Sequence, residues 1–477
     1  MVVHPPDSRG LRAVTVNGEP AGSAWSVRDL RKQLHRAGLP KDMDLADRTT
    51  VTWREGGRDT WPDRLWRRRG IIALMAAGLL SSMILLVDVG RVDALGALTF
   101  AGRITGFLFV FAGAAQGLAA AAVFDYWGKR TLAYSGALVL VGVLIALATE
   151  GVFLFLWFQQ REYTRYVPAF FAISLWTLWA LWAVRSQQPW KGIPHPKRFT
   201  AGLTATAILA IANFAYSTVY QPAAANLTFS IDATFGKPVP DLVRPVIHLP
   251  VEMTIRNTGT VPAYVLAAGY RVSGRTSEFE KDRAKFDQKE WRKAAEWSID
   301  TELHVDPIGY QSLNVGPILT PGLMLYPGDT RGSRAVVQIP KDANYDLIVT
   351  GVGISLLRAD RAKIGAEFAV PAFSWNQQDP RFYECNPSPC PDYVMHHGRL
   401  RYSNNLLNVT RRPRYISSVR MLGENGAESD MFVSSYNAEG KFSRKQESLD
   451  RFGITGVLGG GAMTPFAALL PARTPQP

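Results

Sequence analysis

The sequence predicts an integral membrane protein: a membrane α-helical bundle of about five spans, preceded by a small α+β segment and followed by a mainly β, sandwich-like domain. Long apolar runs are concentrated between residues 71 and 220, whereas short alternating runs separated by Gly, Pro and Asn fill residues 221–477. The mean hydropathy of −0.02, despite 19% charged residues, fits an average over a very apolar part and an ordinary soluble part.

The distribution of charge follows the same division. The net formal charge is +5 over residues 1–70, +5 over 71–220 and +3 over 221–477. We therefore divide the chain into a cytoplasmic N-terminal module (1–70), a five-helix transmembrane region (71–220) and an extracytoplasmic, mainly β domain (221–477). No concentrated basic stripe accompanies aromatic residues in the N-terminal part, so the expected partner is the lipid bilayer and not a nucleic acid.

The N-terminal module has the pattern of a small β–α–β unit. Residues 11–17 and 49–54 alternate as strands do, and Ser26 is placed to cap a helix that ends at Gly38. The apolar residues of that helix recur on one face: Val27, Leu30, Leu34 and Ala37. The segment carries no phosphate-binding loop, paired metal ligands or nucleophile signature, so we interpret it as an interaction module.

Five apolar runs follow, each near the ~20 residues that a helix needs to cross ~30 Å of hydrocarbon. They are Ile71–Val87, Ile104–Phe124, Leu132–Phe158, Val167–Val184 and Phe199–Tyr220. The first residues lack the apolar core and cleavage site of a secretory signal, so the first run is expected to act as an uncleaved anchor.

Positive charge in the short flanking segments predicts the orientation, because cytoplasmic loops are enriched in Lys and Arg. The basic flanks precede the first span, join the second to the third and join the fourth to the fifth; they contain Arg64, Arg67, Arg68, Arg69, Lys129, Arg130, Arg185, Lys191, Lys197 and Arg198. With five spans, all three flanks lie on one side. The N-terminus is then cytoplasmic, and residues 221–477 are extracytoplasmic.

Small and polar residues inside the spans give two further expectations. Gly102, Gly106, Gly113 and Gly117 share one face of the second helix and predict close packing against a neighbouring helix. Glu150 is the only acidic candidate for a transport path, and we interpret it as an interfacial or helix-packing carboxylate.

The extracytoplasmic domain has turn motifs typical of β proteins. The stretch VEMTIRNTGTVPAYVL (251–266) resembles the strand–turn–strand pattern of bacterial immunoglobulin-like envelope domains, with Asn and Gly supplying positive φ, and Leu325–Asp329 resembles the turn before a later strand. This resemblance covers about 227–370 and implies a sandwich. The whole chain resembles uncharacterised multi-pass membrane proteins of high-GC Gram-positive bacteria, a resemblance that implies no activity. One helix, Ser277–Trp297, is expected between the strands.

Two groups of residues in this domain are candidates for chemistry. A basic cluster could share one face and bind an anionic envelope ligand through bidentate contacts, with internal ion pairing as the alternative: Arg399, Arg401, Arg411, Arg412 and Arg414, with Arg420 nearby. Cys385 and Cys390 are expected to form a disulfide, since an outward location favours oxidation. Their spacing to His396 and His397 matches no zinc motif, so no metal is expected.

The leading hypothesis is therefore a non-catalytic, multi-pass protein of the cell membrane whose extracytoplasmic domain binds, senses or scaffolds. Other envelope proteins or anionic envelope polymers are its candidate partners. No catalytic motif and no cofactor-binding motif is present in the sequence. A transporter or channel subunit is one alternative and requires Glu150 and Gln116 in the bundle interior. An extracytoplasmic hydrolase is the other and requires a cleft with a nucleophile, a base and oxyanion donors.

The orientation can be tested with reporter fusions at the span ends. Because the basic flanks set the topology, fusions after Arg69, Arg130 and Arg198 should report a cytoplasmic location. Fusions after Gln160 and Pro222 should report an external one. An external signal at Arg130 would contradict the five-span arrangement.

Overall fold

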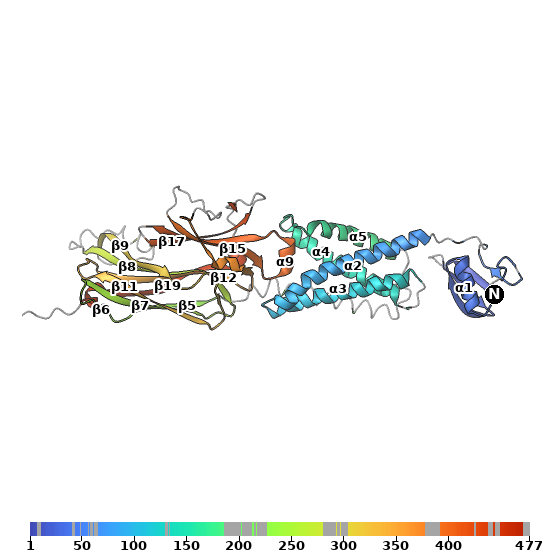
Figure 1. Cartoon of the computed structure of the whole chain (residues 1–477), viewed down its shortest axis with the longest axis horizontal. Helices are drawn as coiled ribbons and strands as arrows, with labels where there is room; N and C mark the ends of the chain where they lie inside the picture. Colours follow the sequence, from blue (N-terminus) through green and yellow to red (C-terminus); the bar gives the residue numbers. More distant parts are fainter. Residues whose placement is uncertain are drawn as a thin grey trace, which may run out of the picture. The chain divides into compact units, whose positions relative to one another are not determined.

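The computed structural model describes residues 1–6, 11–40, 65–128, 134–185, 227–279, 304–376, 392–423, 426–436 and 449–470, with most of 43–61 and a few isolated residues. The chain forms two compact units (Figure 1). The first comprises Met1–Ser217 together with Asn405–Arg411, and the second comprises Thr218–Asn404 and Arg412–Pro477.

The first unit begins with a four-stranded sheet covered by one helix. The elements are β1 (Val2–Pro6), β2 (Arg12–Val16), β3 (Glu19–Ala24), α1 (Val27–Arg36) and β4 (Thr52–Trp53), and the strand order is β3-β2-β1-β4. The Asp29 amide donates to Ser26 Oγ at 3.2 Å, which confirms the predicted cap. Leu30 and Leu34 are buried against the sheet. The sequence did not predict β1 and β3.

Four long helices follow. They are α2 (Leu65–Gly96), α3 (Phe100–Tyr126), α4 (Ser135–Phe158) and α5 (Val167–Arg185), and each is long and apolar enough to cross a membrane. This agrees with the predicted membrane region. Most of the fifth predicted run, 199–220, lies outside the described residues. Within it, Asn213 Nδ2 donates to Thr105 Oγ1 on α3 at 3.0 Å.

Glycines bring α2 and α3 into backbone contact. A Cβ added at Gly106 would lie 2.2 Å from Ala94 N and 2.7 Å from Gly90 O, and one added at Gly113 would lie 2.8 Å from Val87 Cγ2. The other two predicted packing glycines are also confined: an added Cβ would lie 2.8 Å from Met83 Sδ at Gly117, and 2.9 Å from Thr99 Oγ1 at Gly102. Three of the four therefore face α2, where any side chain would push the helices apart.

A short helix from much later in the chain completes this unit. Helix α9 (Asn405–Thr410) packs Leu406 and Val409 against apolar residues of α2, α4 and α5. The Asn405 amide donates to both carboxylate oxygens of Asp93, at 2.9 and 3.0 Å, and Asn405 Nδ2 donates to Val89 O at 3.1 Å. Thr164 Oγ1, in the α4–α5 connection, donates to Val409 O at 2.8 Å.

The second unit is built from three antiparallel sheets. Sheet B has the order β11-β7-β5, with β6 beside β7; sheet C has the order β10-β8-β12-β19, with β9 beside β8; sheet D has the order β13-β15-β16-β17-β18, with β14 beside β15. The strand bounds are β5 Phe229–Phe235, β6 Val239–Pro240, β7 Val246–Asn257, β8 Ala263–Phe279, β9 His304–Pro317, β10 Met324–Leu325, β11 Thr330–Pro340, β12 Leu347–Arg358, β13 Ala362–Ile364, β14 Pro371–Phe373, β15 Tyr393–Tyr402, β16 Arg414–Gly423, β17 Gly426–Tyr436, β18 Phe442–Ser443 and β19 Ile454–Pro465.

Sheet C shares a core with each of the other two sheets. Alternate residues of β7 and β11 meet alternate residues of β8 and β12 in one large apolar core. A smaller core joins the opposite face of sheet C to sheet D through Leu266, Leu357, Phe368, Leu400 and Ile416. Short 3₁₀ helices, Ala366–Ala369, Leu449–Phe452 and Phe466–Leu469, close the edges of these cores.

Two local predictions for this unit need correction. Neither Asn257 nor Gly259 adopts positive φ; Asn257 is buried and acts through its side chain, whose Nδ2 donates to Val261 O and Leu325 O. Gly328, in the second predicted turn, does have positive φ. The helix expected to start at Ser277 is wrong for residues 277–279, which extend β8 and pair with β9. Most of the remaining predicted helix lies outside the described residues.

The role of the glycine contact can be tested by substitution. Gly106→Leu should destabilise the bundle by about 1–3 kcal/mol, since its Cβ would overlap the α2 backbone. Thermal unfolding of the purified protein measures this effect. Gly151→Leu on α4 is the matched control, because nothing lies within 4 Å of its added Cβ. Equal unfolding midpoints for the two variants would argue against close α2–α3 contact.

Candidate functional site

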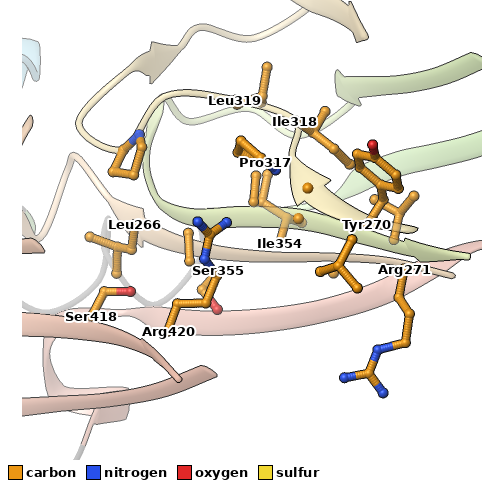
Figure 2. Close-up of a pocket in the computed structure, with 18 of the residues that line it drawn as sticks. Leu266, Tyr270, Arg271, Pro317, Ile318, Leu319, Ile354, Ser355, Ser418 and Arg420 are labelled. Carbon is orange, nitrogen blue, oxygen red and sulfur yellow. The ribbon is translucent and has the colours of Figure 1, made fainter. Parts of the chain in front are cut away.

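A cleft of about 970 Å³ lies in the second unit, between sheets C and D. Its lining comes from β8, β9, β12 and β19 on one side and from β14, β15 and β16 on the other, with residues 318–321 closing a third side. Figure 2 shows Pro317, Ile318 and Leu319 above the cleft and Ser418 and Arg420 below it. A cavity of this size is in the range of small-molecule binding sites.

Glycines are frequent on the part of sheet C that faces the cleft. In the β8–β12 pairing, Gly269 faces Gly353, and in the β12–β19 pairing Gly456 faces Ser355. The intervening residues, such as Val352 and Ile354, point their side chains into the core shared with sheet B. Alternation along the strands therefore places Gly269, Gly351, Gly353 and Gly456 on the floor of the cleft, beside Arg271, Ser355 and Leu458.

Sheet D supplies the opposite wall. Val394 pairs with Arg420, and His396 pairs with Ser418, so these four side chains lie on the same face of the β15–β16 ladder. Two residues further along each strand the face is filled by packing: an added Cβ at Gly398 would lie 2.7 Å from Phe368 Cβ. The two sheets are thus packed at one end and separated at the other.

The charge of the lining is positive. Among the described residues that line the cleft are Arg271, Arg420 and His396, and none is an aspartate or a glutamate. No acceptor for the Arg420 guanidinium is found within the described parts of the chain. Figure 2 shows Arg420 pointing into the cleft beside Ser355, whereas Arg271 extends away from it. The cleft therefore suits an anionic group at Arg420.

The cleft is poorly equipped for hydrolysis. Ser418 and His396 are cross-strand neighbours, but the His396 ring uses Nδ1 to donate to the Phe368 carbonyl at 3.0 Å. A catalytic triad needs an acidic or amide side chain to orient the histidine, and the described lining contains neither.

The predicted arginine cluster is not gathered at one site. Arg411 belongs to the first unit, where its guanidinium donates to Gln159 Oε1 at 3.2 Å, whereas the other members lie in the second unit. Strand alternation places Arg399 and Arg401 on one face of sheet D. Arg414, on β16, shares the opposite face with Arg420, and Arg412 lies in the connection before β16.

Arg399 and Arg401 both act on the carboxylate of Glu367. The Arg399 amide donates to Glu367 Oε1 at 2.9 Å. This hydrogen bond and one from the Glu367 amide, with the charges of Arg401 and Arg399, hold the pKa of Glu367 below its ordinary value. Sequence alone could not single out Arg420, because only the strand register shows which arginine faces the cleft.

The histidines and cysteines do not form a described metal site. His396 and His397 point to opposite faces of β15, as consecutive strand residues must, and His397 Nδ1 lies 2.8 Å from Ser417 Oγ. Cys385 and Cys390 lie outside the described residues, so the disulfide stays a prediction.

A second polar group lies inside the helical bundle. Ser82 on α2, Gln116 on α3 and Glu150 on α4 are at most 1% exposed, and their side-chain oxygens and nitrogen have no hydrogen-bond partner among the described residues. Gly113 and Gly117, which flank Gln116, both face Met83, so Ser82 and Gln116 lie at the same level. The sequence predicted an interfacial or helix-packing carboxylate, and the burial of Glu150 among the helices fits the helix-packing alternative.

Comparisons with known proteins give no family. No protein-family model matches the sequence, and no curated protein matches it significantly. A crystal structure of the protein named ApaA from Bordetella pertussis aligns with 15% identity over 28% of this chain and 80% of that chain, at a TM-score of 0.16. An X-ray structure of a Northeast Structural Genomics Consortium target aligns with 8% identity. The alignment covers 28% of this chain and 74% of that chain, at a TM-score of 0.15. Alignments this loose carry no inference.

The openness of the cleft gives a stability prediction. Gly351→Leu and Gly456→Leu should leave the unfolding midpoint nearly unchanged, because nothing lies within 4 Å of either added Cβ. Gly398→Leu, on the packed part of sheet D, should lose about 1–3 kcal/mol through its clash with Phe368. Differential scanning calorimetry of the three variants measures this. A large loss in Gly351→Leu would mean that the space is already filled.

Proposed function

We propose that the protein is a multi-pass, non-catalytic cell-envelope membrane protein whose extracytoplasmic β domain binds an anionic ligand. The observation that supports this most directly is the cleft: a lining with two arginines and no described acidic residue, in which Arg420 has no described acceptor. In this proposal the packed sheets form the sandwich-like domain expected from the turn motifs, and the N-terminal sheet module is the cytoplasmic part.

The position of α9 supports the outward orientation. Asp93 and Val89 lie at the C-terminal end of α2, and Thr164 lies between α4 and α5, so α9 docks at the end of the bundle that carries both of these connections. Helix α5 ends at Arg185, at the opposite end. The predicted fifth span, between Arg185 and Asn405, would return the chain to the end at which α9 docks.

The proposal is tested by anion binding to the full chain in nanodiscs of neutral phosphatidylcholine. Glycerol 3-phosphate should bind weakly, and binding should weaken as salt rises, because the contact is electrostatic. Arg420→Gln should reduce the affinity about tenfold or more, as expected for loss of a charged hydrogen bond. Isothermal titration calorimetry measures this.

The matched control is Arg334→Gln on β11, whose side chain is 66% exposed and lies outside the cleft. Its affinity for glycerol 3-phosphate should equal that of the wild type. No binding to the wild type, or equal losses in both variants, would reject the proposed anion-binding cleft.

A second function, transport of protons or cations, is favoured by the polar interior of the bundle. Buried polar groups in a membrane bundle commonly mark ion pathways, and Glu150, Gln116 and Ser82 come from three different helices. The fold alone does not distinguish this role from helix packing.

The transport function is tested in proteoliposomes with a pH-sensitive dye inside and a potassium diffusion potential. Glu150→Gln should abolish protein-dependent proton or cation flux, because the amide cannot carry the charge change. Glu252→Gln, an exposed carboxylate on β7, should leave the flux unchanged. Absence of flux in the wild type, or its persistence in Glu150→Gln, would eliminate this second candidate.

A further inference from the structure

We infer that the ligand of the cleft is an anionic amphiphile: a molecule with one phosphate or carboxylate head, held by Arg420, and an apolar tail that lies across the floor of sheet C. This inference rests on the proposed function and narrows its ligand to one chemical class.

The first observation is that large apolar side chains of the lining are left facing solvent. Val315 is 36% exposed, Phe373 is 37% exposed and Leu458 is 89% exposed, and all three line the cleft. They come from β9 and β19 of sheet C and from β14 of sheet D, on the two sides of the cleft. An apolar tail would remove all three from water at once, which no polar ligand could do.

The second observation concerns what the described lining lacks. It contains no asparagine, glutamine, aspartate, glutamate, lysine or tryptophan. A sugar polymer presents many hydroxyl groups, each of which needs a donor or acceptor when it leaves water. The described lining offers few polar side chains to such a ligand, so we favour an amphiphile over the anionic envelope polymers considered from the sequence.

The third observation concerns Arg420 and the hydroxyl group beside it. Ser418 and Arg420 are two residues apart on β16 and therefore share a face, while the Arg271 side chain extends elsewhere (Figure 2). One guanidinium with an adjacent hydroxyl matches one phosphate or carboxylate head. The floor lets a chain approach the backbone of β12 and β19 closely at Gly351 and Gly456, where nothing lies within 4 Å of an added Cβ.

The test compares three probes with the full chain in neutral nanodiscs, with empty nanodiscs subtracted. Octyl phosphate should bind at least tenfold more tightly than glycerol 3-phosphate, since only octyl phosphate has a tail. It should also bind at least tenfold more tightly than octanol, which has no charge. Arg420→Gln should reduce octyl phosphate binding to the level of octanol, and Arg420→Lys should restore part of it.

A second variant distinguishes binding of the apolar tail from binding of the anionic head. Gly351→Leu places a side chain in open space on the floor, so it should remove the advantage of octyl phosphate while leaving glycerol 3-phosphate binding intact. If octyl phosphate binds no more tightly than glycerol 3-phosphate, the amphiphile is wrong and the anion-binding function stands. If neither binds, both proposals fail.

The amphiphile can come from the bilayer or from solution, and a last comparison distinguishes the two. Nanodiscs that contain phosphatidic acid should compete with octyl phosphate if bilayer lipids reach the cleft. Octyl phosphate binding that is unaffected by phosphatidic acid assigns a soluble amphiphile.

Discussion

At Gly90 and Gly106 the backbones of α2 and α3 touch, and the helical bundle is arranged around that contact. In hydrocarbon, apolar side chains gain nothing by leaving lipid for one another, so helices associate through close packing and through polar contacts. The glycines supply the close packing. The interior then encloses Ser82, Gln116 and Glu150, whose cost is tolerated only where the surrounding helices fit tightly.

The same residue type has the opposite effect in the β unit. In α3 the space beside Gly106, Gly113 and Gly117 is occupied by the backbone or side chains of α2, whereas beside Gly351 and Gly456 it is empty. The difference depends on whether the neighbouring helix or sheet places atoms beside the glycine. Sheet D packs against sheet C where Phe368 and Leu400 fill the gap, and it presents Val394 and Arg420 where nothing fills it. A cleft results where the two sheets are not packed together.

Much of this architecture could be predicted from residue patterns, and the remainder depends on contacts that patterns do not contain. Four membrane helices and the Ser26 cap were predictable because continuous apolar runs and capping residues act locally. The start of the Ser277 helix was wrong because pairing with β9 outweighed a local helical pattern.

The candidate site was less accessible to prediction. The glycines of the floor appear in the sequence as turn signals, and only the strand register places them on one face. The same register places Arg420 on the cleft face of sheet D, and Arg399 and Arg401 on the opposite face. Helix α9 has six residues, too few for a helical period to show, and its partners lie more than two hundred residues earlier.

Helix α9 also has a consequence for the order in which the molecule is assembled. Asn405 and Asp93 are separated by 312 residues, so during synthesis α2 through α5 emerge and insert long before the segment that caps them exists. Until then the Asp93 carboxylate and the Val89 carbonyl lack this partner, and the apolar patch that receives Leu406 and Val409 is uncovered. Docking of α9 is therefore a late step that marks a nearly finished chain. A protein truncated before β15 would leave that end of the bundle open, a difference that a quality-control protease could recognise.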